Sequence, residues 1–181
     1  MKAQTEKPPE FSYLLPLDSL GAGEKKLTLT AGEDARAALA QRFDLVSLDN
    51  LTATLAVRRI PKSPLVRVLG RFSADIVQTC VLTGYPVPAH IEEAVAARFG
   101  PEEAEPPEVE FHPDEEDPPE AFTGNAIELG EWLSQCLAVA MDPYPRAQGA
   151  ELATLTESRE SADSDSYRPF ESLLANRKRN S

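Results

Sequence analysis

The stretch LTATLAVRRIPKSPLVRVLGRFSADI, residues 51–76, decides the fold of this chain. In each of its two halves, residues 51–59 and 66–76, every second position is apolar or small, as in a strand that buries one face. Pro61 and Pro64 between the halves cannot donate to a strand ladder, and they therefore end both runs. The stretch is predicted to form an antiparallel hairpin.

Further strands are predicted on both sides of this hairpin. Residues 11–15 and 25–29 alternate in the same way and are separated by Gly21 and Gly23, so they are expected to form a second, shorter hairpin. Residues 87–99 carry apolar side chains at odd positions, although their alanine content would also suit a helix. We favour the strand, which would be a third antiparallel member of the sheet.

Two helices are expected to pack on this sheet. The capping-box spacing from Thr30 to Glu33, followed by apolar residues at helical intervals, predicts one helix over about residues 32–43. Apolar residues recur at steps of three and four over residues 127–141 and predict the other, which the following prolines end. The predicted fold class is α+β: an antiparallel sheet of about five strands, which could curl toward a barrel, with two main helices packed on it.

The excess negative charge of the chain lies almost entirely in one segment. The net charge is −12, and residues 101–120 hold ten Asp or Glu, no Lys or Arg and six prolines. Such a segment cannot bury enough apolar surface to offset the entropy of ordering it, so a solvated loop is expected. The loop should repel nucleic acid and attract a cationic partner. Its candidate contact residues are Glu102, Glu103, Glu105, Asp114, Glu115, Glu116 and Asp117.

The length of the chain suits one domain with tails. A single α+β domain is predicted over residues 1–150. Residues 151–181 are predicted to be a mostly disordered tail, rich in Ser, Glu, Asp and Thr, with a short amphipathic segment at 169–175. No stretch approaches roughly 18 uninterrupted apolar residues, and the first residues lack the apolar run of a signal peptide. A cytoplasmic protein without membrane contact is expected.

The sequence offers no recognisable catalytic or metal-binding motif. Glycine-rich nucleotide loops, the paired-histidine zinc motif and the nucleophile elbow Gly-x-Ser-x-Gly are not found. His90 and His112 are the only histidines, and they are too far from Cys80 and Cys136 in sequence for a zinc knuckle. Each thiol lies in an apolar run, where a reduced cysteine packs as a small hydrophobic residue. We therefore predict no catalytic residue, no metal and no cofactor.

Five basic residues and no acidic one lie within residues 58–71. If the apolar side of the hairpin is buried, alternation sends Arg58, Arg67 and Arg71 outward on the same sheet face, with Lys62 at the turn. Aligned guanidinium groups can bind RNA phosphates bidentately. The alternative is an ordinary solvated face, because no aromatic residue is interleaved to stack on bases. The candidate RNA-binding residues are Arg58, Arg59, Lys62, Arg67 and Arg71.

Residues 68–87, VLGRFSADIVQTCVLTGYPV, resemble the Gly-x-x-x-Ala, Gln-x-Cys and Pro-Val core of the YceD family, the large ribosomal RNA subunit accumulation proteins. Residues 37–43 are similar to the helix that precedes this core in the alphaproteobacterial branch. Residues 126–133 and 142–145 resemble the second block of the family, and residues 169–174 resemble its Pro-Phe-x-x-Leu ending. The resemblance spans most of the chain.

This resemblance implies a bacterial, non-enzymatic factor needed for normal accumulation or processing of large-subunit ribosomal RNA. The implied partners are large-subunit rRNA or its precursor, a small basic protein of the large subunit, or both. Many members carry Cys-x-x-Cys in the core, whereas this chain reads Cys80-Val-Leu-Thr83. A metal-binding role therefore does not transfer, since a lone thiolate and a hydroxyl are a poor zinc ligand set.

Three modes of action remain open. In the first, the acidic loop binds a basic ribosomal protein while the basic hairpin contacts rRNA. In the second, the protein is an RNA-binding module that its own acidic loop inhibits by covering the hairpin. In the third, the clustered carboxylates hold magnesium in an RNA-processing hydrolase, for which a proline-rich loop is poorly suited because such sites need rigid elements.

Overall fold

A computed structural model describes residues 8–101, 119–122 and 124–150. The predicted tail, residues 151–181 with the segment 169–175, lies outside the described residues. So do all seven candidate contact residues of the predicted acidic loop. The main element is a five-stranded sheet in the order β2-β3-β4-β5-β6. Its strands are β2 Lys25–Thr30, β3 Ser47–Arg59, β4 Val66–Thr79, β5 Pro86–Pro101 and β6 Glu120–Phe122.

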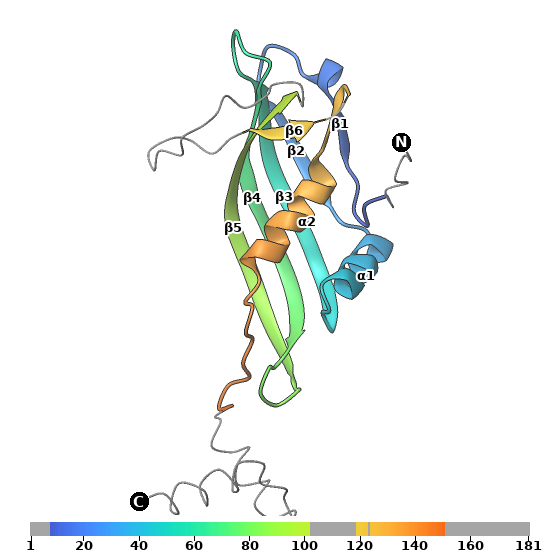
Figure 1. The fold of residues 1–181 in the computed structure, drawn as a ribbon, viewed down its shortest axis with the longest axis vertical. Helices are drawn as coiled ribbons and strands as arrows, with labels where there is room; N and C mark the ends of the chain where they lie inside the picture. Colours follow the sequence, from blue (N-terminus) through green and yellow to red (C-terminus); the bar gives the residue numbers. More distant parts are fainter. Residues whose placement is uncertain (1–7, 102–118, 123, 151–181) are drawn as a thin grey trace, which may run out of the picture.

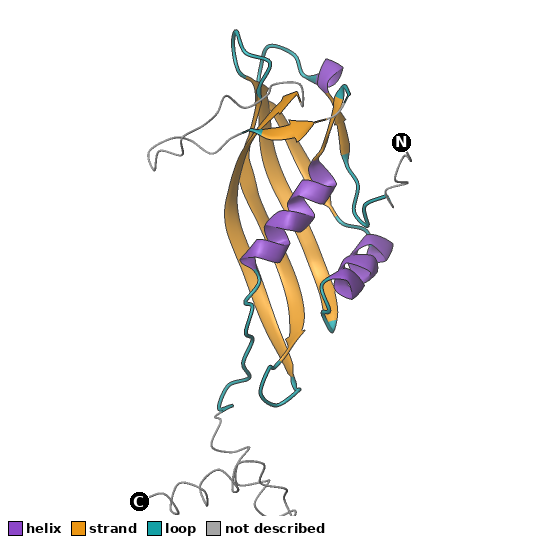
Figure 2. Ribbon diagram, in the orientation of Figure 1, coloured by secondary structure: helices purple, strands orange, loops and turns teal. Residues whose placement is uncertain are grey.

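Two helices and a small second sheet complete the described part of the chain. The second sheet pairs β1 Leu14–Pro16 with β7 Ala126–Glu128, and a short 3-10 helix, η1 Leu17–Ser19, follows β1. Helix α2, Leu129–Ala140, crosses one face of the main sheet, while α1, Glu33–Arg42, lies beside the far end of β3 (Figure 1). Within the described residues, the opposite face of the main sheet is not covered by a helix (Figure 2).

The predicted central hairpin is confirmed. Strands β3 and β4 pair antiparallel, and the turn between them is closed by a hydrogen bond from the Ile60 N–H to the Leu65 carbonyl at 2.9 Å. The strand that we favoured for residues 87–99 is also confirmed as β5, which pairs antiparallel with β4 along its whole length. Gly70 allows β3 and β4 to approach, because a Cβ there would lie 2.2 Å from the Thr54 carbonyl oxygen.

The pairing predicted for residues 11–15 with 25–29 is wrong. Strand β1 pairs with β7, far along the chain, and β2 pairs with β3 instead. The register of the small sheet places Leu15 opposite Ile127, and both side chains are fully buried against α2 and the main sheet. The fifth strand of the main sheet is β6, which runs parallel to β5. The sheet is thus mixed, and β2 and β6 form open edges rather than closing a barrel.

Both predicted helices are present, but their first residues differ from the prediction. Thr30 is the last residue of β2, so the predicted capping box does not form, and Gly32 caps α1 without a side-chain hydrogen bond. Helix α2 begins at Leu129 rather than at residue 127, because Ala126–Glu128 forms β7. The Glu128 side chain then caps α2 by accepting a hydrogen bond from the Gly130 N–H.

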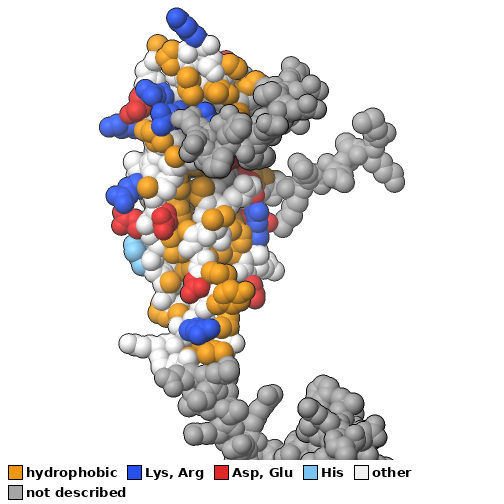
Figure 3. Space-filling view, turned by 60° about the vertical axis from the view of Figure 1, so that its left-hand side comes forward, with side chains coloured by type: hydrophobic (Ala, Val, Ile, Leu, Met, Phe, Trp, Pro, Cys, Tyr) orange, Lys and Arg blue, Asp and Glu red, His pale blue; other side chains and the backbone are white. Residues whose placement is uncertain are grey.

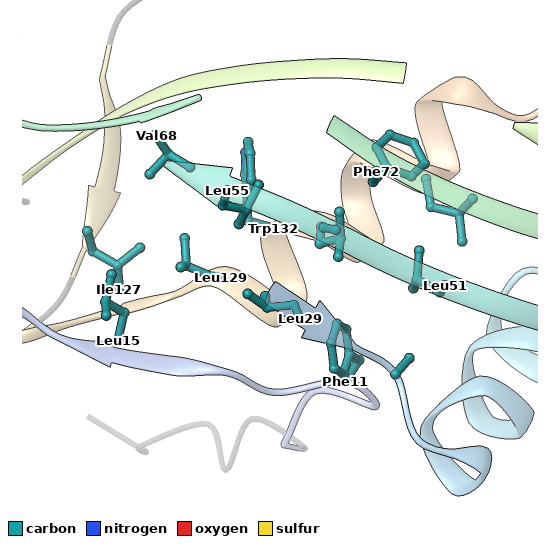
Figure 4. Packing of buried hydrophobic residues seen from close by; sticks show 14 of the residues in the cluster. Phe11, Leu15, Leu29, Leu51, Leu55, Val68, Phe72, Ile127, Leu129 and Trp132 are labelled. Atoms are coloured by element: carbon teal, nitrogen blue, oxygen red, sulfur yellow. The ribbon is translucent and has the colours of Figure 1, made fainter. Parts of the chain in front are cut away.

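The core lies between α2, the small sheet and the inner face of the main sheet. Helix α2 contributes Leu129, Trp132 and Leu133 at helical spacing. These pack among the inward residues of the strands, as Figure 4 shows for Leu51, Leu55, Val68 and Phe72. Among the described residues, no helix has the length and apolar composition that crossing a membrane requires.

Candidate nucleic-acid interface

Three arginines stand side by side across the three longest strands of the sheet. Arg58 of β3 lies directly opposite Arg67 of β4, and Arg67 lies directly opposite Arg98 of β5. The residues that precede or follow them, such as Val57 and Val68, are fully buried on the inner face. The arginines therefore project from the outer face, where the Cβ atoms of directly opposite residues are about 4.5–5.5 Å apart.

Two more basic residues extend this row on the same face. On the outer face of β4, Arg71 is the next residue after Leu69. It lies opposite Thr54 of β3. Lys26 of β2 lies opposite Ala56 of β3, and Ala56 is the neighbour of Arg58 on the outer face of β3. Figure 3 shows Lys and Arg side chains gathered along the upper part of this face. We call this surface the outer basic face and define it as Lys26, Arg58, Arg67, Arg71 and Arg98.

Among the described residues, no ion pair is seen for Lys26, Arg58 or Arg67 of this face. The only ion pair seen within the described residues for Arg58, Arg67 and Arg71 joins Arg71 Nε to Glu92 Oε1 at 3.8 Å. Its side chains are 68% and 57% exposed, so the pair is weak and screened by solvent. The predicted common orientation of Arg58, Arg67 and Arg71 is confirmed, whereas their binding to RNA stays a prediction.

Arg59 and Lys62 do not join the outer basic face. Arg59 faces the inner side, where its Nη2 and Nε atoms donate to the carbonyls of Leu17 and Leu20 at 2.8 and 3.3 Å. It therefore fastens η1 and the residue after it to the end of β3. Lys62 lies in the turn between β3 and β4 with a φ of 61°, beyond the ends of both strands.

The other half of the outer face has a different character. Asp75 of β4 lies opposite both Asn50 of β3 and His90 of β5, and His90 Nδ1 contacts Asp75 Oδ1 at 2.6 Å. The hydrogen bond from His90 lowers the pKa of the Asp75 carboxyl. In Figure 3 the pale-blue histidine lies below most of the blue side chains of this face, and acidic side chains lie close to both. Positive charge is thus concentrated at one end of the sheet.

Cys80 has a structural role that the sequence does not reveal. It follows β4, is 2% exposed, and its Sγ accepts a hydrogen bond from the Ala147 N–H at 3.3 Å. This bond, followed by one from the Thr83 hydroxyl, lowers the pKa of the thiol to about 7. The Val81 N–H also donates to the Pro145 carbonyl at 2.9 Å. Together these bonds fasten the segment after α2 to the β4–β5 turn.

The second thiol, Cys136, is half-buried on α2, and its pKa is raised to about 11, chiefly by burial. Both cysteines are free. Within the described ranges, no three His, Cys, Asp or Glu side chains are grouped so that they could hold a metal ion. The carboxylates of the predicted acidic loop and His112 lie outside those ranges.

Comparison with known proteins gives one match. No curated protein and no solved structure matches this chain. A family model described as "Large ribosomal RNA subunit accumulation protein YceD" matches residues 68–175. The matched region begins in β4, includes β5 and α2, and holds Arg71 and Arg98 of the outer basic face. Since it covers more than half of the chain, this protein belongs to the YceD family.

Proposed function

We propose that this protein supports the accumulation of large-subunit ribosomal RNA in the cytoplasm by binding the RNA through the outer basic face, without catalysing a reaction. The description of its family connects its members with accumulation of that RNA. The observation that supports a direct contact is the row Arg58–Arg67–Arg98 across three strands. Like charges placed directly opposite one another destabilise a sheet. An anionic ligand would convert that repulsion into attraction.

The chemistry of the row suits phosphate groups. Each guanidinium presents several N–H donors in a planar fork and has no acceptor, so it matches two oxygens of one phosphate. Adjacent strands are about 4.8 Å apart, which keeps the stems of the three side chains in a fixed order. Each phosphate that the face neutralises releases counterions, so binding should weaken steeply as salt increases.

The residues between the charges favour contact with the RNA backbone over contact with bases. Ala56, Leu69 and Ala96 form the neighbouring row on this face, and Leu69 is 37% exposed. Single-stranded RNA is usually read by aromatic side chains on which bases stack, and the outer basic face includes none. We therefore propose that the face binds phosphates with little sequence preference, and that other contacts supply any specificity.

The test compares two double variants that lose the same charge. R58Q/R67Q removes two arginines of the row. The control K25Q/R146Q removes two basic residues that are not part of the outer basic face, Lys25 on the inner side of β2 and Arg146 after α2. Binding of a labelled large-subunit rRNA fragment is measured by fluorescence anisotropy at several salt concentrations. R58Q/R67Q should bind roughly tenfold to a hundredfold more weakly and lower the salt slope by about 1.4 to 1.8. Equal losses in the two variants would remove the outer basic face from the proposal.

Two further experiments test the alternative modes of action, autoinhibition by the acidic segment and RNA hydrolysis. Deleting residues 102–118 should strengthen RNA binding if the acidic segment inhibits the basic face, and should leave it unchanged or weaker if that segment serves another partner. Incubating the RNA with protein and Mg²⁺ should leave the RNA intact. The control variant has the acidic candidate residues replaced by the corresponding amides: Glu102, Glu103, Glu105, Asp114, Glu115, Glu116 and Asp117. RNA cleavage by the unmodified protein that this variant no longer shows would contradict the non-enzymatic proposal.

A further inference from the structure

A hollow of about 320 Å³ lies between the first turns of α2 and the short strands β1, β6 and β7. Helix α2, whose first turns line the hollow, covers one side of the sheet (Figure 1), and the outer basic face is on the other side. The volume of the hollow is at the lower end of the range for ligand sites. Apolar walls come from Phe99, Phe122 and Trp132, and carboxylates come from Glu120, Glu128 and Glu131.

Two of the aromatic residues that line the hollow are packed against each other. The rings of Phe99 and Trp132 pack edge to face, with centroids 5.8 Å apart and planes at 77°. Both residues are almost fully buried, at 4% and 5% exposure. Phe99 is paired in register with Glu120 of β6, so the sheet brings the backbone of Glu120 beside that of Phe99. The hollow is therefore built from paired strands and packed rings.

Two of the three carboxylates already have partners. Glu128 caps α2 and also accepts hydrogen bonds from the Ser12 hydroxyl at 2.6 Å and from the Tyr13 N–H. Glu131 forms a bidentate ion pair with Arg42, with both N–O distances at 2.8 Å. Each of these carboxylates is thus committed to the fold.

Glu120 is different, because no Lys or Arg of the described residues forms an ion pair with it. Partial burial raises the pKa of its carboxyl, and the neighbouring Trp132 side chain opposes part of that rise. The charge of Glu120 also contributes to the raised pKa of the nearby Cys136 thiol. A carboxylate for which the described residues supply no counter-ion, in a hollow lined by both aromatic and carboxylate side chains, is complementary to a cation that carries an apolar stem.

We propose that this hollow receives a lysine or arginine side chain of a basic partner protein. Lys and Arg bury their methylene stems along apolar surface while the charged end stays at a polar rim. Here the stem would lie along the aromatic walls and the cationic end would pair with Glu120. A metal ion fits less well, since two of the three carboxylates are engaged with donors. This inference does not rest on the RNA-binding proposal, because it concerns different residues on the opposite side of the sheet.

The single tryptophan of the chain allows a specific test. Its indole N–H gives one side-chain signal in a ¹H–¹⁵N NMR spectrum, and Trp132 and Glu120 both line the hollow. The full-length protein is titrated with a hexa-arginine peptide, with a hexaglutamine peptide as the neutral control. The indole signal should shift and saturate with hexa-arginine only. In E120Q the affinity read from this signal should fall about tenfold, whereas the matched exposed-loop variant E24Q should match the unmodified protein.

The indole readout separates this site from other acidic surfaces that also attract the peptide. Movement of backbone amide signals without movement of the indole signal would show binding elsewhere and would overturn the proposal. Equal indole titrations in E120Q and the unmodified protein would also overturn it. Because Glu120 lies on the surface, E120Q should keep the other amide signals in place, which verifies that its fold is intact. Failure of this titration leaves the rRNA-binding measurement untouched.

Discussion

Replacing the central arginine of the row, Arg67→Gln, should change stability and RNA affinity in opposite directions. In the free protein Arg67 faces Arg58 on one side and Arg98 on the other. Two exposed unit charges about 5–10 Å apart in water repel each other by about 0.4–0.8 kcal/mol, and salt screens part of this. Removing the charge of Arg67 should therefore stabilise the fold by about 0.5 kcal/mol.

The same change removes one phosphate contact from the bound state. A hydrogen bond to a charged group is worth about 1.5–3 kcal/mol. Arg67 is exposed, so the lower end of this range applies and affinity should fall roughly tenfold. The slope of log affinity against log salt should decrease by about 0.7–0.9. A surface residue with no functional role would show neither effect on binding.

Two measurements on the same samples test this reasoning. Thermal unfolding in low salt should show a midpoint about 1–2 °C higher for R67Q, and anisotropy titration with the rRNA fragment should show the weaker binding. R146Q, an exposed arginine outside the row, serves as the matched control and should change neither quantity appreciably. A lower midpoint for R67Q would refute the repulsion argument. An unchanged affinity and salt slope would refute the contact with phosphate.

Three further predictions follow from individual contacts. R59Q should destabilise the fold by about 1–2 kcal/mol in urea denaturation, because it loses the bonds to the carbonyls of Leu17 and Leu20, but RNA affinity should stay the same. Glu128→Ala should cost about 1–2 kcal/mol by removing the cap of α2, and an unchanged denaturation midpoint would contradict that role. The pKa of the Cys80 thiol is lowered from 9.0 to about 7 in the folded state, because the fold stabilises the ionised thiol. This contribution to folding stability is complete above about pH 9 and is lost as the pH falls through 7. Cys80→Ala should flatten this rise of stability between about pH 7 and pH 9, and an equal slope in both proteins would count against it.

The central part of the fold and of the candidate site can be predicted from local pattern. Alternation within residues 51–76 suffices to predict the β3–β4 hairpin and to place Arg58, Arg67 and Arg71 on one face. Arg98 and Lys26 could not be assigned to that face, because their positions depend on the register of β5 and β2 against the hairpin. Register is set by packing of whole strands, and a shift of one residue would reverse the face of each side chain.

Contacts between distant segments explain the remaining differences. Alternation in residues 11–15 correctly indicates a strand, but only the buried pair Leu15 and Ile127 decides that its partner is β7. Glu128 reads as part of a helical run, yet its bonds to Ser12 and Gly130 make it the cap instead. Arg58 and Arg59 are adjacent in sequence, so they face opposite sides of β3. Arg58 projects from the outer face, whereas Arg59 donates a hydrogen bond to the Leu17 carbonyl of η1.

The arrangement of charge on this sheet is difficult to explain by stability alone. A sheet that only needed a solvated outer face could place hydrogen-bonding partners opposite one another, as Asp75 and His90 are at the other end of the same strands. Instead, one register brings three arginines together across β3, β4 and β5. The carboxylates that line the hollow beside α2 come from the opposite side of the sheet. A fold that keeps both charges apart in this way can hold an anionic ligand on one side and a cationic one on the other at the same time.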